Sequence, residues 1–176
     1  MRMSVSTTLS LFRASEYFSG QWSFTRTIRC ADSFAEIARI ENGSARFDRV
    51  EDLERKGELL YSESGKLRMN GKESYLDVTR QYLYRSMTEE SKMNVYFFNV
   101  HNESEHLKFF HTLHFRQDKE GIGLRATAEH LCIKDLYKVD VRLHNPFVFE
   151  TRWEVRGPRK NNIISTTFKK MNGSKQ

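Results

Sequence analysis

In several aromatic-rich segments, the residues at every second position combine aromatic side chains with charged or hydrogen-bonding ones. Arg26, Glu63 and Arg80 are charged members of these series, and an arginine can hold a carboxylate or phosphate through two parallel hydrogen bonds. Because side chains two positions apart on a strand share a face, each series marks one face of an expected strand. The four series are Gly20, Trp22, Phe24, Arg26; Tyr61, Glu63, Gly65; Arg80, Tyr82, Tyr84; and Ala126, Ala128, His130, Cys132.

These faces fit a polar pocket inside a barrel better than the interior of a sandwich. A sheet that packs only against another sheet would carry mainly Val, Ile and Leu on that face, whereas a ligand-holding barrel carries aromatics with a few convergent polar groups. We therefore predict non-covalent binding of an anionic or amphipathic small molecule. The expected ligand-binding residues are Arg26, Tyr61, Glu63, Arg80, Tyr82, Tyr84, His111, His130, Asp135, Tyr137 and Trp153.

Each of these residues has an expected role. Arg26, Arg80 and His130 would contact the ligand, and the tyrosines and the tryptophan would form the walls. Glu63 and Asp135 would orient the arginines, since buried charges are costly unless they are paired. In the alternative, the two carboxylates neutralise both arginines, and the barrel is filled by a polar network without a ligand.

Two other classes of function stay open. The chain could be an enzyme acting on such a ligand, with His130 or Glu63 as the proton carrier and Tyr137 as a hydrogen-bond donor. It could also be a non-catalytic scaffold or assembly subunit with a solid barrel and a basic docking face. The standard hydrolase, phosphate-loop and zinc-protease motifs do not occur, so we favour a binding protein over an enzyme.

Zinc and haem are the cofactor alternatives. A zinc site would use His111, His130, Cys132 and Asp135, but their spacing matches no standard zinc motif. A haem site would use one of the two histidines, with Met69 or Met93 assisting, and it is supported by fold analogy alone. We therefore predict neither cofactor.

Composition bounds the partners and the compartment. The 176 residues carry a net charge of +6 with 12% aromatics, and this basic balance favours an anionic partner or a solvated basic surface. Nucleic-acid binding is not expected, because the aromatics that would stack on bases face inward. Only Cys30 and Cys132 occur, and no apolar run is long enough to span a membrane. We expect an intracellular protein, cytoplasmic or mitochondrial.

Turn residues separate ten expected strands within a single domain, residues 1–176. Spacings of this kind are typical of an antiparallel barrel or sandwich, and sequential hairpins close most easily as an up-and-down, lipocalin-like barrel. A short helix from Thr8 to Tyr17 would close one end, unless the acid-free opening segment is an organellar transit sequence. Residues 1–7 and 171–176 are expected to be flexible. The strands are Gly20–Cys30, Gly43–Val50, Gly57–Leu67, Asp77–Ser86, Lys92–Val100, Leu107–Arg116, Gly123–Cys132, Asp135–Leu143, Phe147–Arg156 and Asn162–Lys170.

Several short motifs occur in an order that identifies a family resemblance. They are Gly20-Gln21-Trp22, Gly43-Ser44-Ala45-Arg46-Phe47, Tyr61-Ser62-Glu63-Ser64-Gly65, Arg80-Gln81-Tyr82, Phe110-His111, the segment His130 to Tyr137 and the segment Trp153 to Lys160. This arrangement resembles the uncharacterised family called domain of unknown function 6314, over about Phe12 to Phe168. The resemblance implies one small barrel, similar to lipocalins or fatty-acid-binding proteins. In lipocalin-like barrels a Gly-x-Trp segment opens the first strand, so we expect Trp22 to close the floor of the barrel. The resemblance implies no activity.

Overall fold

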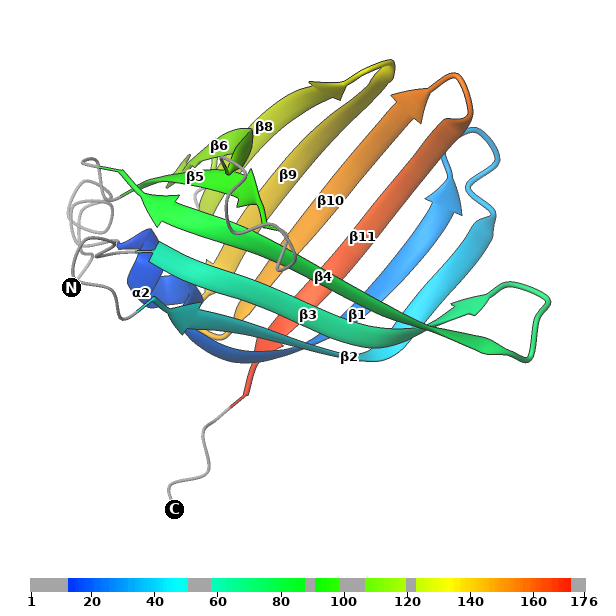
Figure 1. Cartoon of the computed structure of the whole chain (residues 1–176), viewed down its shortest axis with the longest axis horizontal. Coiled ribbons are helices and arrows are strands. Elements are labelled where there is room, and N and C mark those ends of the chain that lie inside the picture. Colours follow the sequence, from blue (N-terminus) through cyan, green and yellow to red (C-terminus); the bar gives the residue numbers. More distant parts are fainter. Residues whose placement is uncertain (1–12, 51–57, 88–90, 99–106, 120–122, 172–176) are drawn as a thin grey trace.

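Antiparallel strands curl into a nearly closed barrel in the computed structural model (Figure 1). The structure describes residues 13–50, 58–87, 91–98, 107–119 and 123–171. Within these ranges it has one sheet of eleven strands and one short helix. The prediction of an all-β antiparallel barrel with a short N-terminal helix is confirmed.

The elements follow the chain in simple order. They are α2 (Ala14–Phe18), β1 (Gly20–Cys30), β2 (Glu36–Arg49), β3 (Glu58–Met69), β4 (Tyr75–Ser86), β5 (Lys92–Phe97), β6 (Lys108–His114), β7 (Arg116–Gln117), β8 (Leu124–Cys132), β9 (Asp135–Asn145), β10 (Val148–Gly157) and β11 (Lys160–Lys170).

Strands that follow each other in the chain pair with each other, except for β6 and β7, and the first strand also pairs with the last. The order in the sheet is β6-β5-β4-β3-β2-β1-β11-β10-β9-β8-β7. The segments β6 and β7 flank Phe115; β6 pairs with β5 and β7 pairs with β8, so this bent stretch of chain bridges the two edges. The ladder between β4 and β5 covers only Tyr82–Ser86. Among the described residues, the first half of β4 therefore has a ladder partner on one side only.

Two expected boundaries were wrong. The Glu41-Asn42-Gly43 turn is part of β2, which begins at Glu36 rather than at Gly43. Phe24 pairs with Gly43 and Arg26 pairs with Ile40, so extra residues bulge out of β2 without ending the strand. The expected strand Leu107–Arg116 is divided at Phe115 into β6 and β7. Part of the expected helix, residues 8–12, lies outside the described residues.

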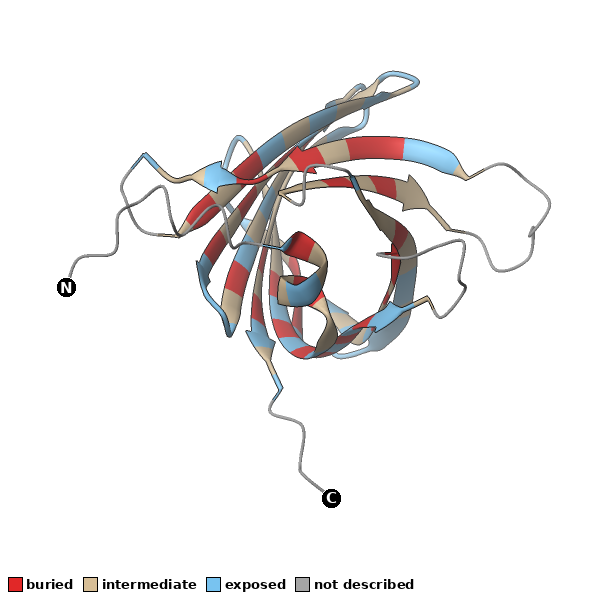
Figure 2. Cartoon of the chain, turned by 90° about the vertical axis from the view of Figure 1, so that its left-hand side faces the viewer, coloured by how far each residue is buried: buried red, intermediate tan, exposed pale blue. Residues whose placement is uncertain are grey.

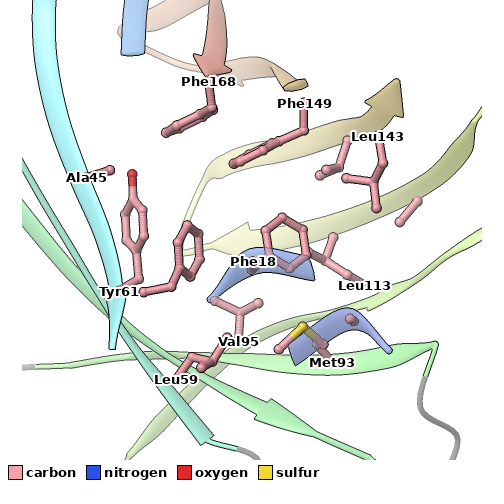
Figure 3. Packing of buried hydrophobic residues seen from close by; sticks show 14 of the residues in the cluster. Phe18, Ala45, Leu59, Tyr61, Met93, Val95, Leu113, Leu143, Phe149 and Phe168 are labelled. Carbon is pink, nitrogen blue, oxygen red and sulfur yellow. The ribbon is translucent and has the colours of Figure 1, made fainter. Parts of the chain in front are cut away.

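The helix α2 lies across one end of the barrel, as Figure 2 shows. Its Phe18 packs against Phe149, with ring centroids 5.2 Å apart (Figure 3), and against Phe47, with ring centroids 5.3 Å apart. Trp22 is fully buried beneath the helix. Its Nε1 donates a hydrogen bond of 2.7 Å to the carbonyl of Phe18, and the Lys170 ammonium lies 5.1 Å from its ring centroid. This end is therefore closed by aromatic packing.

The inward alternation expected from the sequence is present in the first strands. Trp22, Phe24 and Arg26 are buried on β1, and Tyr61 and Glu63 are buried on β3. No helix within the described ranges is long and apolar enough to cross a membrane.

Gly43 is required by the aromatic ring that lies over it. A Cβ placed on Gly43 would come within 2.2 Å of the buried Phe24 ring. We therefore expect Gly43→Ala to destabilise the fold by about 1–3 kcal/mol through overpacking, measured as a lower urea midpoint. In a Phe24→Leu background the ring is absent, so the added Gly43→Ala substitution should cause a smaller loss of stability than it does in the unmodified chain. Equal losses in the two backgrounds would contradict the account.

Candidate functional site

A cavity of about 280 Å³ lies inside the barrel. This volume is close to the lower end of the ~300–1,000 Å³ range of small-molecule sites. Its lining is predominantly aromatic and aliphatic, and its charged members are two arginines and one glutamate. The lining residues are Phe18, Arg26, Phe47, Tyr61, Glu63, Arg80, Tyr82, Tyr84, Phe97, Phe110, Leu113, Cys132, Tyr137, Val141, Phe149, Thr151, Trp153, Val155, Ile164 and Phe168.

A buried ion pair stands at the centre of this lining. The Arg26 Nη1 and Nη2 atoms donate hydrogen bonds of 2.7 Å each to Glu63 Oε1 and Oε2, and Arg26 Nε donates one of 2.9 Å to Thr166 Oγ1. The Tyr61 hydroxyl donates a further hydrogen bond to Glu63 Oε2. Three strands therefore contribute to one network: Arg26 comes from β1, Thr166 from the neighbouring β11, and Glu63 with Tyr61 from β3.

This network fixes the ionisation of its members. Burial alone would raise the pKa of Glu63, but the hydrogen bonds and charge of Arg26, together with the Tyr61 hydroxyl, hold it below its usual value. Burial raises the pKa of Tyr61 and Tyr84. The carboxylate of Glu63 is thus ionised at neutral pH, and the two phenols are neutral hydrogen-bonding groups.

Arg80 is the second guanidinium of the lining, and its situation differs from that of Arg26. It lies opposite Glu63 in the β3–β4 ladder, with its Nε 4.0 Å from Glu63 Oε1. The Arg80 side chain is 50% exposed, whereas the Arg26 side chain is 10% exposed. Because Arg26 already makes both short contacts with the carboxylate, two cations face one anion, and the solvent-facing cation is Arg80.

Flat aromatic rings form one wall of the cavity. The Phe110 and Trp153 rings lie 5.5 Å apart at an interplanar angle of 5°, and the Tyr82 and Phe110 rings lie 5.8 Å apart at 17°. Tyr61 stacks on Tyr82 at 6.2 Å and 21°. Four strands, β3, β4, β6 and β10, thus present nearly parallel rings toward the interior.

The two histidines lie behind this wall, outside the residues that line the cavity. The His130 ring packs edge-on against Phe110 at 5.0 Å, and His111 contacts Phe110 at 4.4 Å and Trp153 at 5.5 Å. The His111 Nδ1 atom is buried without a hydrogen-bond partner in the described structure. Burial, with a smaller contribution from His130, lowers the pKa of His111 to about 4.

Asp135 lies at the end of the barrel opposite α2 rather than beside an arginine. Its carboxylate binds Lys160 Nζ at 2.7 Å, and Lys160 also donates to the Tyr137 hydroxyl at 3.0 Å. The role expected for Asp135, orienting an arginine, is therefore taken by Glu63 alone. The part of the chain that the structure describes contains no group of three or more His, Cys, Asp or Glu side chains able to hold a metal ion.

The structure brings together most of the residues that the sequence singled out. Eight of the eleven expected residues line the cavity, whereas His111, His130 and Asp135 do not; the eight are Arg26, Tyr61, Glu63, Arg80, Tyr82, Tyr84, Tyr137 and Trp153. Thr166, Phe110 and Phe149 were not among the expected site residues. Closure of the barrel could have indicated Thr166, because it requires β1 and β11 to pair, and Arg26 lies opposite Thr166 in that ladder.

Comparison with known proteins identifies a family and a fold. The chain matches the family of unknown function DUF6314 over residues 18–170, and no curated protein matches it. Among solved structures, it is similar to the S-type phycobiliprotein lyase CPES from Guillardia theta, with a TM-score of 0.62 and 9% identity over 98% of this chain and 100% of that one. A de novo designed fluorescence-activating β-barrel has 12% identity over 92% of this chain and 100% of its own, with a TM-score of 0.44.

The Arg26–Glu63 pair should dominate the stability of this region. Glu63→Gln leaves the buried Arg26 guanidinium without a counter-charge, so we expect a loss of about 3–5 kcal/mol in the free energy of unfolding at neutral pH. Urea denaturation measures it. Glu154→Gln is the control, because Glu154 is half-exposed and pairs with arginines on the outer face. A comparable loss in both variants would contradict the central role of the buried pair.

His111 should make the fold sensitive to mild acid. Its pKa falls from 6.5 to about 4 on folding, so the unfolded chain takes up a proton first. The free energy of unfolding is therefore not reduced by His111 above pH 6.5. It falls as the pH drops from 6.5 toward 4, by about 3 kcal/mol in total. We expect His111→Phe to flatten the dependence of unfolding free energy on pH in this interval. An unchanged slope in the variant would show that His111 is not the responsible group.

Proposed function

We propose that this chain, which belongs to the family of unknown function DUF6314, binds a small amphipathic molecule with an acidic group inside its barrel. The observation that carries the proposal is the surplus positive charge of the cavity. Arg26 and Arg80 face the single carboxylate of Glu63, and Arg26 holds that carboxylate at 2.7 Å. An acidic group of a ligand would restore the balance by binding Arg80, in a setting where charge-assisted hydrogen bonds are strong.

The rest of the cavity favours an apolar, flat body for this ligand. Near-parallel rings of Tyr82, Phe110 and Trp153 form one wall, and aromatic faces of this kind pack well against aromatic or conjugated groups. Cys132 and Tyr137 line the far end, where β8 turns into β9. We infer that the acidic group lies at Arg80 and that the apolar body extends toward α2.

The geometry gives less support to the alternatives. Arg26 and Tyr61 make three hydrogen bonds to the Glu63 carboxylate and hold its pKa below its usual value, which makes it a weak base, and His130 does not line the cavity. A scaffold with a solid barrel does not fit a cavity of about 280 Å³. The similar lyase from Guillardia theta indicates that this fold alone does not separate binding proteins from enzymes. Our preference for binding therefore depends on the side chains.

Two matched dyes test the proposal. The anionic probe is 8-anilinonaphthalene-1-sulfonate, and the neutral probe is N-phenyl-1-naphthylamine, which has the same aromatic system without the sulfonate. We expect Arg80→Met to weaken the sulfonate by about 10- to 100-fold, the value of a hydrogen bond to a charged group. Affinity for the neutral dye should stay unchanged. Fluorescence titration measures both dissociation constants, and near-UV circular dichroism checks that tertiary packing is retained.

The control is Arg46→Met, the same substitution at an exposed arginine on the outer face of β2, where it pairs with Asp48. It should change neither dissociation constant. If Arg80→Met bound the sulfonate as tightly as the unmodified chain, Arg80 would not be the anion contact. If the unmodified chain bound neither dye, the proposal of a ligand-binding barrel would be wrong.

A further inference from the structure

Three neighbouring hairpins form a continuous rim at the end of the barrel opposite α2 (Figure 1). We call residues 29–35, 156–160 and 131–135 the hairpin rim; they are the turns between β1 and β2, between β10 and β11, and between β8 and β9. The Ala31 amide donates to the Asn161 carbonyl at 2.9 Å, and Lys160 binds Asp135 at 2.7 Å. The three turns are therefore fixed to one another.

Large apolar side chains at the rim face solvent. Ile133 is 90% exposed, and Phe34 and Leu131 are each 66% exposed. Single exposed apolar residues are ordinary on protein surfaces, but here the three most exposed large apolar side chains of the described residues lie at the same end of the barrel. Phe34 and Ile133 lie on the two outer hairpins of the rim, on either side of the turn at 156–160.

Both of these side chains stand on unfavourable backbone. Phe34 has φ of 57° and Ile133 has φ of 60°, a region in which bulky and β-branched residues are rare. Ile133 and Lys134 form a two-residue turn between Cys132 and Asp135, and hairpins with positive φ at the first turn position prefer glycine there. Both side chains are largely exposed, so packing contacts do not compensate for the backbone cost. The apolar side chain at each of these positions therefore needs another explanation.

The rim is also basic. It carries Arg29, Lys134, Arg156, Arg159 and Lys160 against Asp32 and Asp135, so five cations accompany two carboxylates. Within the described part of the chain, Arg29, Lys134 and Arg159 make no ion pair. The central turn contributes three of the cations. A surface that meets this rim should therefore be negatively charged and should admit apolar side chains at two separated points.

We propose that the hairpin rim docks on the surface of an anionic lipid bilayer. Phe34, Leu131 and Ile133 would enter the boundary between headgroups and acyl chains, while the cations contact lipid phosphates and carboxylates. A bilayer accepts apolar tips at any lateral spacing, whereas a nucleic acid would leave Ile133 and Leu131 without apolar partners. Docking in this orientation directs the Cys132 and Tyr137 end of the cavity toward the membrane.

Vesicle flotation tests the docking surface directly. The full chain should float with vesicles of phosphatidylcholine mixed with phosphatidylserine and should bind phosphatidylcholine alone more weakly, with the difference reduced by salt. Lys134→Ala and Arg159→Ala should each lower binding to the mixed vesicles by about fivefold. Phe34→Ser/Ile133→Asn should lower it by tenfold or more, because two buried apolar side chains are lost.

A matched control uses the opposite end of the barrel. Phe147 is 58% exposed in the turn between β9 and β10, beside α2, and Phe147→Ser should leave vesicle binding unchanged. Arg80→Met should also leave it unchanged, so failure of the docking proposal is distinguishable from failure of the cavity proposal. An equal loss in Phe147→Ser would overturn the assignment of the rim.

Thermal unfolding gives a second readout that separates docking from a structural role. Asparagine tolerates positive φ better than isoleucine, so Ile133→Asn should raise Tm while it weakens vesicle binding. A fall in Tm would show that Ile133 supports the fold instead. If the unmodified chain does not float with the anionic vesicles, the proposal is wrong, and an acidic protein partner becomes the explanation to test for the rim.

Discussion

The ion pair between Arg26 and Glu63 is the constraint on which the interior of this barrel depends. Two charges buried in a small barrel are stable only when they meet each other and when their remaining hydrogen-bonding groups are satisfied. Tyr61 and Thr166 provide those extra contacts. An aliphatic side chain in place of either Arg26 or Glu63 alone would leave a buried charge unpaired, so the middle of the barrel is polar while the end beneath α2 is aromatic. The cavity is lined by both groups, the ion pair and the aromatic side chains near α2.

The two ends of the barrel differ in packing and exposure. At one end, Phe18, Trp22 and Phe149 pack together, and Tyr17 fixes α2 by donating to the carbonyls of Asn145 and Val148 at 2.7 and 3.0 Å. At the other end, hairpins present Ile133 to solvent on strained backbone. Buried aromatic packing thus lies at the α2 end, whereas exposed apolar side chains on unfavourable backbone lie at the hairpin rim.

The alternation of side chains along the strands was sufficient to predict the barrel and much of the cavity. Arg26, Glu63 and Tyr61 could be placed inside because a strand has a period of two. Alternation gives the face of a residue but not its height in the barrel, and for this reason Asp135 was expected beside an arginine although it lies at the rim with Lys160. His130 faces inward as expected, but Phe110 and Phe97 cover it.

Other features depend on contacts between distant segments. Glu41-Asn42-Gly43 has the composition of a turn, but pairing with β1 and the Phe24 ring over Gly43 keep it within a strand. Positive φ at Ile133 contradicts the local preference of isoleucine, so no rule of composition would have found it. Likewise, the sequence does not show that Arg80 lacks a close counter-charge. This follows only from the structure, in which Arg26 makes both 2.7 Å hydrogen bonds to Glu63.

The most direct measurement of the central claim removes the buried pair as a neutral unit. In Arg26→Met/Glu63→Leu both charges disappear together, and replacement of a buried pair by apolar residues is often tolerated. If Arg26 is committed to Glu63 and Arg80 alone holds the acidic group, the folded double variant should bind 8-anilinonaphthalene-1-sulfonate with undiminished affinity. Loss of sulfonate binding in a double variant with native near-UV circular dichroism would show that Arg26 is itself the anion contact, and would contradict the account.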